Sequence, residues 1–211
     1  MLVSCSLRRS FVLTHSIDQS SAANAAVTFD FHFRSLVPAD GGALHALVAA
    51  CQPLDANSLY CNLLQCSHFG STSIGAFNPS NCLVGSITGY RIPERAETLF
   101  VWQVAVHPAM RGRRLGSDML HRLVQSLNSC SATDSGAPPV RYIETSITLG
   151  NEASIRLFAG FAKACATPIS RSVLFDKTEH FASTHDTEYL FRIGPLQSES
   201  FDEITSTGEI S

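Results

Sequence analysis

The sequence contains no apolar run long enough to cross a bilayer, so we predict no transmembrane helix. It also has no excess of positive charge, because 15 Lys and Arg residues face 18 Asp and Glu residues, for a formal net charge of −3. We therefore predict no general affinity for nucleic acid or for an anionic membrane surface.

Metal-ligand spacing is missing among the seven cysteines. Neither a CxxC motif nor a cysteine–histidine cluster occurs, so we predict no structural zinc site and no other bound metal. The number of cysteines is odd, and several lie on apolar faces of predicted elements. We therefore expect buried free thiols in a reducing compartment.

Acidic residues are absent from the start of the chain until Asp18, while Arg8, Arg9 and many serines occur there. This composition is compatible with an organelle transit peptide and equally with a disordered extension. We exclude residues 1–27 from the fold and assign residues 28–196 to one domain without repeats. Residues 197–211 are polar and acidic, and we expect a disordered tail. The expected location is the cytoplasm, or a mitochondrion or plastid if residues 1–27 are a transit peptide.

The most informative segment is residues 100–116, FVWQVAVHPAMRGRRLG. Its first half is rich in strand formers, and Pro108 cannot continue a strand ladder because it has no N–H. A basic loop follows and opens a helical apolar pattern that runs to about residue 128. Backbone N–H groups at a helix start, with arginines beside them, favour a phosphate ligand. An ordinary basic loop before a helix is the competing interpretation.

Periodicity along the rest of the chain predicts the order β α α β β β α β α β β and a mixed α/β or α+β fold with one central sheet. The expected strands lie at 29–33, 73–77, 83–90, from 100, 140–147, 172–175 and 188–193, and the other helices at 44–51, 59–69 and 151–163. Asp40 and Asn151 are the predicted N-caps of the first and last helices. A surface loop is expected at 129–139, and a polar loop precedes the last strand.

The six residues from Arg111 to Gly116 resemble motif A of the GNAT acetyltransferase superfamily, in which Arg or Gln is followed by two residues, Gly, one residue, and Gly or Ala. Arg114 stands where the motif has its first glycine. If the loop needs a left-handed residue there, Arg114 strains it; if only its N–H is used, Arg114 adds charge. The predicted element order also matches the GNAT fold, and residues 151–158 resemble the superfamily's second cofactor segment.

Further segments are similar to the L-2,4-diaminobutyrate acetyltransferase family of ectoine biosynthesis: 51–58, 90–95, 99–104, 142–145 and 192–196. The resemblance implies direct transfer of acetyl from acetyl-CoA to the 4-amino group of diaminobutyrate in a ternary complex, a role in osmoprotection, and a homodimer. Two alternatives stay open: a GNAT enzyme for another diamine or amino acid, and an acyl-CoA sensor without catalysis.

For the cofactor, the resemblance implies that two neighbouring strands separate, so that backbone groups of Val104 and Val106 face the pantetheine arm and hold the thioester oxygen. The pyrophosphate is expected on the basic loop and the helix start. The cofactor candidates are Val104, Ala105, Val106, Arg111, Gly112, Arg113, Arg114, Leu115, Gly116, Ser117, Asn151 and Ser154.

For the substrate, two cationic amines require carboxylates. Asp55 lies in a predicted helix–helix loop, and Glu144 lies inside an apolar strand, where a carboxylate is costly unless it is paired or used. Trp102 could form an aromatic wall against a cation. The substrate-binding candidates are Asp55, Asn57, Tyr60, Arg91, Trp102, Glu144 and Thr145.

The chain has Leu157 and Phe158 where many GNAT enzymes have a tyrosine that protonates the leaving thiolate. The acid must then come from solvent or from elsewhere, with Tyr60 and His185 as candidates, the latter because imidazoles titrate near neutrality. Glu144 is the favoured base for the substrate ammonium, so replacing it by Gln should cut turnover strongly while acetyl-CoA binding persists.

Overall fold

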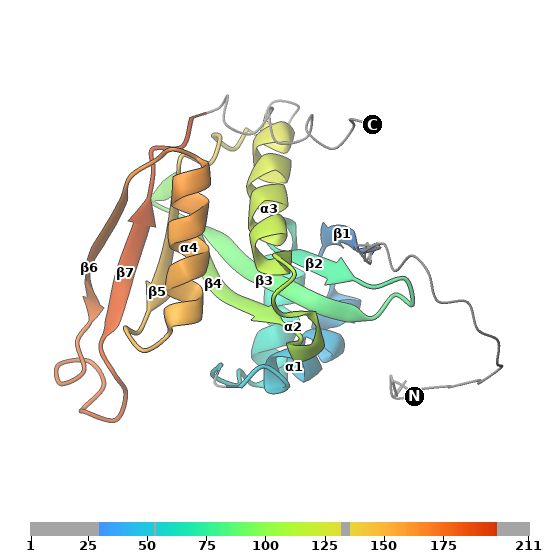
Figure 1. Cartoon of the computed structure of the whole chain (residues 1–211), viewed down its shortest axis with the longest axis horizontal. Helices are drawn as coiled ribbons and strands as arrows, with labels where there is room; N and C mark the ends of the chain where they lie inside the picture. The colour runs from blue at the N-terminus through green and yellow to red at the C-terminus, as the bar shows by residue number, and fades with distance from the viewer. Residues whose placement is uncertain (1–29, 53, 132–135, 198–211) are drawn as a thin grey trace, which may run out of the picture.

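The structure is a computed structural model, and it describes residues 30–52, 54–131 and 136–197. One seven-stranded mixed sheet has the order β1-β2-β3-β4-β5-β7-β6. Figure 1 shows α3 and α4 on one face of this sheet and α1 and α2 on the other. The strands are β1 (His32–Ser35), β2 (Ile74–Phe77), β3 (Leu83–Ile92), β4 (Arg95–Val106), β5 (Tyr142–Ile147), β6 (Ile169–Phe175) and β7 (Glu188–Ile193). The α-helices are α1 (Gly41–Ala49), α2 (Leu59–His68), α3 (Leu115–Ser131) and α4 (Glu152–Ala164), and short 3-10 helices lie at Pro38–Asp40, Gly70–Thr72 and Pro108–Met110.

The predicted element order is confirmed, and the differences lie at element ends. The strand of residue 100 begins five residues earlier, at Arg95, and α3 continues to Ser131 into the predicted loop. The first strand begins at His32, and Phe29 lies outside the described residues. Residues 1–27 and nearly all of 197–211 also lie outside them, so both terminal predictions stay predictions.

Two helix starts were predicted through their caps, with different outcomes. The Asn151 side chain accepts the N–H of Ser154 at 3.1 Å and caps α4 as predicted. Asp40 precedes α1, but its side chain does not cap that helix. Its carboxylate instead binds the Arg34 guanidinium at 2.7 and 2.8 Å and the N–H of Val37 at 2.9 Å. The ion pair therefore replaces the predicted cap.

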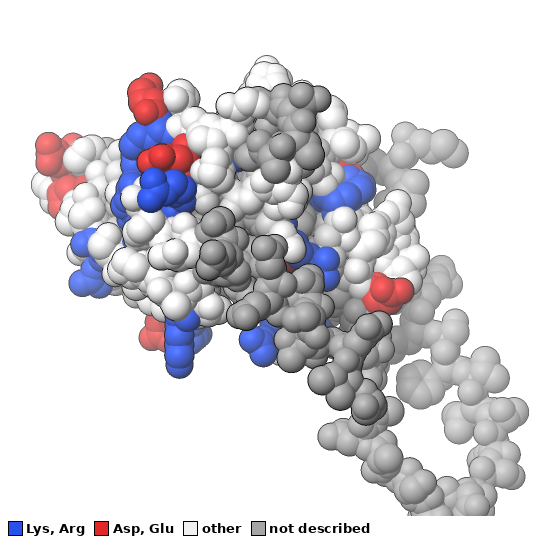
Figure 2. Space-filling view, turned by 90° about the horizontal axis from the view of Figure 1, so that it is seen from above, with Lys and Arg blue, Asp and Glu red and all other residues white. Residues whose placement is uncertain are grey.

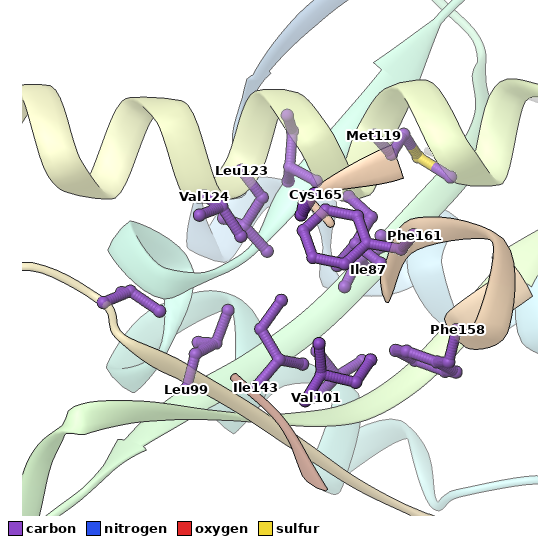
Figure 3. Packing of buried hydrophobic residues seen from close by; sticks show 14 of the residues in the cluster. Ile87, Leu99, Val101, Met119, Leu123, Val124, Ile143, Phe158, Phe161 and Cys165 are labelled. Carbon is purple, nitrogen blue, oxygen red and sulfur yellow. The ribbon is translucent and has the colours of Figure 1, made fainter. Parts of the chain in front are cut away.

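The larger core lies between the sheet and the pair α3 and α4, where Leu120, Phe158 and Phe161 are buried against Ile87 and Ile143. Figure 3 shows Phe158 and Phe161 meeting Ile87 and Ile143 in this core. A smaller core packs α1 against the opposite face. Cys51, Cys66 and Cys165 are buried free thiols, as predicted, whereas Cys61 and Cys82 are half-buried. Burial raises the pKa of the Cys66 and Cys165 thiols to about 11, so they stay protonated.

The surface carries basic and acidic side chains interspersed among uncharged ones on the face seen in Figure 2. In the described ranges, no helix combines the length and apolar character that crossing a bilayer requires.

The sheet divides in its middle, and this division positions the functional site. β4 pairs in parallel with β5 only from Thr98 to Val101, although β4 continues to Val106. Beyond that point β4 pairs only with β3, with Val104 opposite Ile87 and Val106 opposite Gly85. Because the His107 N–H donates to the Val84 carbonyl at 2.9 Å, the alternation of an antiparallel ladder turns the backbone groups of Val104 and Val106 away from β3. The predicted separation of two strands is confirmed.

Candidate active site

The gap between β4 and β5 opens into a cleft of about 1610 Å³. Its walls come from the separated strands, the β3–β4 hairpin, the loop and first turn of α3, the start of α4, the α1–α2 loop and the β6–β7 loop. The predicted candidates that line it are Asp55, Asn57, Trp102, Val104, Val106, Arg111, Gly112, Arg114, Leu115, Gly116, Ser117, Glu144, Thr145, Asn151, Ser154 and His185.

One end of the cleft is built for an anion. The first hydrogen bond of α3 runs from the Asp118 N–H to the Arg114 carbonyl at 3.0 Å. The N–H groups of Leu115, Gly116 and Ser117 therefore precede the helical ladder and lie at the positive end of the helix dipole. Arg111 and Arg114 line the cleft beside them. This arrangement fits the phosphates of a nucleotide-bearing cofactor.

Arg114 adopts a left-handed conformation with a φ of 60°, and Gly112 has a φ of 75°. The structure therefore selects the first of the two alternatives for Arg114: the loop needs a left-handed residue at the place of the motif glycine. A side chain with a Cβ is strained there, at a cost of roughly 1 kcal/mol.

Replacing Arg114 by Gly should raise the free energy of unfolding by about 1 kcal/mol, because Gly adopts this conformation without strain. Arg114→Ala removes the same charge but keeps the Cβ, so it should bring no such gain. Urea unfolding of both variants measures the difference. Equal stabilities for the two variants would show that the backbone conformation carries no strain.

In another part of the cleft, three side chains converge, two from the α1–α2 and β6–β7 loops and one from the start of β7. The Nε2 atom of His185 lies 3.8 Å from an Asp55 carboxylate oxygen and 3.9 Å from a Glu188 carboxylate oxygen. The Nδ1 atom of His185 is 2.7 Å from the Asp186 carbonyl, which can only accept a hydrogen bond. Nδ1 therefore carries the hydrogen in the neutral ring, and the Nε2 lone pair points toward the two carboxylates.

Glu188 contributes a buried oxygen to this cluster. Its side chain is 17% exposed, and its Oε2 atom is buried without a hydrogen-bond partner among the described residues. A buried carboxylate oxygen without a donor is costly, so this atom fits a cationic ligand group that donates hydrogen bonds. Glu188 was not among the predicted site residues, because a glutamate at the start of a strand carries no motif that marks it.

Glu144 lines the cleft but is already paired. Arg95 binds both of its carboxylate oxygens, at 2.6 and 3.0 Å, and Arg192 binds one of them. Burial alone would raise the pKa of Glu144, but the hydrogen bonds and charges of the two arginines outweigh it and hold the pKa below its usual value. The two guanidiniums oppose protonation, so this geometry is unfavourable for a general base.

Cys51 also lines the cleft. Its thiol donates to the Val106 carbonyl at 3.2 Å. Burial raises the pKa of this thiol, and the neighbouring Arg111 offsets only part of the effect. The thiol therefore stays protonated and is a poor nucleophile.

The structure does not bring four predicted candidates to the cleft lining. The Tyr60 side chain lies on α2 and is 70% exposed. The Arg91 guanidinium donates to the carbonyls of Ala96 and Pro138 at 2.6 and 2.8 Å, so its hydrogen bonds hold a hairpin against the loop before β5. Ala105 is fully buried in the smaller core, and Arg113 lies beside the cleft-lining residues of its loop.

The charges of the cleft differ between its two ends. Away from the α3 start, acidic side chains outnumber basic ones: the acids are Asp55, Glu94, Glu144, Asp186 and Glu188, and the bases are Arg95 and Lys177. This end therefore suits a ligand with a net positive charge. Among the described residues, no group of three or more His, Cys, Asp or Glu side chains could hold a metal ion.

A model of the acetyltransferase (GNAT) family matches residues 45–161 of the sequence. The chain belongs to this family. It is 46% identical to the L-2,4-diaminobutyric acid acetyltransferase of Methylotuvimicrobium alcaliphilum over 75% of this chain and 87% of that protein. The enzyme of the same name from Vibrio cholerae is 45% identical over 79% of this chain and 90% of its own length.

Solved GNAT structures agree with this assignment. The diaminobutyrate acetyltransferase EctA from Paenibacillus lautus, solved with its substrate L-2,4-diaminobutyric acid and coenzyme A, is 33% identical. The match covers 80% of this chain and 96% of that chain, with a TM-score of 0.69. The ribosomal-protein-S18-alanine N-acetyltransferase from Escherichia coli is 11% identical, with a TM-score of 0.58, and shows the fold alone. The predicted GNAT fold is confirmed.

Proposed function

We propose that this chain transfers acetyl from acetyl-CoA to the 4-amino group of L-2,4-diaminobutyrate, giving N4-acetyl-L-2,4-diaminobutyrate. The observation that carries the proposal is the cluster of Asp55, His185 and Glu188, with its unpartnered carboxylate oxygen, in the cleft that begins at the phosphate-binding end of α3. Diaminobutyrate carries two ammonium groups and one carboxylate near neutral pH, so its net charge complements the acidic end of the cleft.

Acetyl-CoA, when bound, supplies an acetyl group activated as a thioester. In our proposal, the N–H groups at the start of α3 hold its pyrophosphate, together with Arg111 and Arg114. The backbone groups of Val104 and Val106, turned away from β3, receive the pantetheine arm, and a backbone N–H polarises the thioester carbonyl as negative charge develops on its oxygen.

For the acceptor, Asp55 and Glu188 bind ammonium groups, and His185 takes the proton from the 4-ammonium. The tautomer set by the Asp186 carbonyl places a lone pair on Nε2, between the two carboxylates. The neutral amine then attacks the thioester carbonyl directly in a ternary complex, because the thiol of Cys51 stays protonated. As the amide bond forms, the C–S bond breaks and coenzyme A leaves as a thiolate. The thiolate takes a proton from solvent, and the new amide nitrogen loses its second proton to solvent. This assignment moves the base from Glu144, which two arginines hold ionised, to His185.

A thiol-release assay with diaminobutyrate, ornithine and lysine tests the proposal against its alternatives. We expect diaminobutyrate to have the highest kcat/KM, by about 10- to 200-fold over ornithine, because one additional methylene changes discrimination by that amount. NMR of the product should show the acetyl group on the 4-nitrogen. A preference for ornithine or lysine would indicate another diamine acetyltransferase, and coenzyme A binding without turnover of any amine would indicate a sensor.

We also propose that the enzyme acts in ectoine formation for osmoprotection.

We further propose that the enzyme forms a homodimer. This proposal is supported by β6, an edge strand with exposed Ile169, Val173 and Phe175. An exposed apolar edge favours association with another surface. Light scattering of the purified protein should give the mass of two chains, and a monomeric mass at micromolar concentration would contradict it.

A further inference from the structure

A single side-chain amide links the acceptor loop to the strand that faces the cofactor. The loop between α1 and α2 carries Asp55, whose side chain is 89% exposed. Gln103 of β4 donates from Nε2 to the Asp55 carbonyl at 3.1 Å and accepts at Oε1 from the Asn57 Nδ2 at 3.1 Å. Because the carbonyl of Asp55 can only accept, the orientation of the Gln103 amide is fixed by its two partners.

The loop is packed at its beginning, where Cys51 is buried and Leu54 contacts the smaller core, and is more exposed from Asp55 onward. Asp55 and Ala56 are exposed, and Asn57 is half-buried. The other described tie from the loop to β4 is the bond from the Cys51 thiol to the Val106 carbonyl, at the beginning of the loop. Exposed loops with few buried contacts open locally at low free-energy cost. The two hydrogen bonds of Gln103 therefore hold the backbone of Asp55 and the side chain of Asn57 in the exposed part of the loop.

The support beneath the loop is rigid by comparison. Gln103 lies opposite Thr88 in the β3–β4 pairing, within the central sheet. It is flanked by Trp102 and Val104, which line the same cleft. Because Gln103 is part of β4, the strand proposed to receive the thioester, any movement of the α1–α2 loop away from Gln103 also moves Asp55 away from that strand. A misplacement of about 1 Å between reacting groups is enough to lower catalytic efficiency strongly.

We infer that Gln103 is a positioning residue that holds the acceptor-binding loop, and with it the carboxylate of Asp55, in register with the cofactor strand. This inference rests on the proposed role of Asp55 in binding a substrate ammonium. Gln103 itself acts through Asp55 and Asn57, and its loss should affect acceptor binding far more than cofactor binding.

Gln103→Met tests the inference, because Met has similar size but cannot make either hydrogen bond. We expect the KM for diaminobutyrate to rise about tenfold. The KM for acetyl-CoA should stay within about twofold of the wild-type value, and the urea midpoint of unfolding should equal that of the wild type within error. Gln125→Met, the same change on α3 outside the cleft lining, should alter none of these values. Equal rises in both KM values, or an unchanged KM for diaminobutyrate, would overturn the inference.

A double-mutant cycle with Asn57→Ala separates the clamp from a direct contact of Asn57 with substrate. If Asn57 acts through Gln103, the double variant should have the same KM for diaminobutyrate as Gln103→Met. If the increases in KM of the two single variants multiply in the double variant, Asn57 has an independent role, and Gln103 positions the loop only through its hydrogen bond to the Asp55 carbonyl. If Gln103→Met fails to fold, Gln103→Asn, which is one methylene too short to reach both partners, serves instead.

Hydrogen exchange of residues 50–58 gives a readout that needs no turnover. The amides of this loop should exchange about tenfold faster in Gln103→Met than in the wild type and in Gln125→Met. Unchanged exchange would refute the clamp even if diaminobutyrate is a good substrate. Faster exchange in a chain that does not acetylate diaminobutyrate would support the clamp and refute the proposed function.

Discussion

Replacing His185 by Asn should lower kcat for diaminobutyrate about 100-fold at neutral pH. Asn retains a donor for the Asp186 carbonyl but has no group that can take a proton from the substrate ammonium. The variant should recover activity as the pH rises, with log kcat increasing by about one per pH unit, because solvent then supplies the neutral amine. Steady-state kinetics across the pH range measures both effects.

His180→Asn is the matched control, because His180 lies in the same β6–β7 loop but does not line the cleft. Its Nδ1 accepts the Asp176 N–H at 3.0 Å, a bond that an Asn oxygen can replace. This control should keep the wild-type kcat and pH profile. A His185→Asn variant with wild-type kcat, or with a reduced kcat that does not recover at high pH, would remove His185 as the base.

The sequence located the β4–α3 segment that lines the cleft because the relevant information is local. Strand formers, Pro108 and a basic loop follow one another within residues 100–116, and the helix that they introduce is where the pattern placed it. The conformation of Arg114 was also posed correctly as an alternative, since a departure from a glycine motif is visible in the sequence. Its φ could not be chosen without the backbone.

The acceptor half depends on pairs that are far apart in the chain. Asp55 and His185 come together only through the packing of two loops, and Glu188 joins them because β7 begins beside that loop. Periodicity cannot show which loops meet across a cleft. Cys51 was missed for the same reason, because its contact with the Val106 carbonyl spans the space between the α1–α2 loop and β4.

Arg91 shows how a correct residue type can lead to a wrong expectation of place. Its charge suits a carboxylate, but the hairpin between β3 and β4 brings the Ala96 carbonyl within 2.6 Å of the guanidinium. Arg95, in contrast, was not among the predicted site residues, yet from the start of β4 it reaches the cleft and binds Glu144. Strand register explains the second partner, because β5 and β7 place Glu144 opposite Arg192.

This ion-pair network leads to the second large expected effect, in Glu144→Gln. The substitution keeps the shape of the side chain and leaves two guanidiniums without their carboxylate. Removing one partner of a buried pair costs roughly 3–5 kcal/mol, but Arg95 and Arg192 are 45% and 32% exposed, so we expect a loss of about 2 kcal/mol in the free energy of unfolding at pH 7.

Glu152→Gln provides the control, because Glu152 pairs with Arg156 on the surface of α4 and both side chains are well exposed. Its loss should cost less than about 0.5 kcal/mol. Urea unfolding at several pH values gives a second check. The pKa of the Glu144 carboxyl is lower in the folded state than in the unfolded chain. Its ionised form therefore stabilises the fold at pH values above the unfolded pKa, and this stabilisation is lost as the pH falls through the folded-state pKa. The gap between wild type and Glu144→Gln should therefore begin to narrow below about pH 4.5 and disappear only once the pH has fallen through the lower folded-state pKa.

Turnover of the same variant decides between the two roles considered for Glu144. If the carboxylate is held by Arg95 and Arg192 and takes no proton from the substrate, kcat should fall far less in Glu144→Gln than in His185→Asn, measured at a temperature where both variants are folded. If Glu144 is the base, kcat should fall about 100-fold in Glu144→Gln with acetyl-CoA binding unchanged, and His185→Asn should keep a kcat near that of the wild type. Glu144 lies in β5 and His185 in the β6–β7 loop, so each substitution tests its own residue. Comparing kcat of the two variants under the same conditions therefore distinguishes a structural ion pair from a catalytic carboxylate.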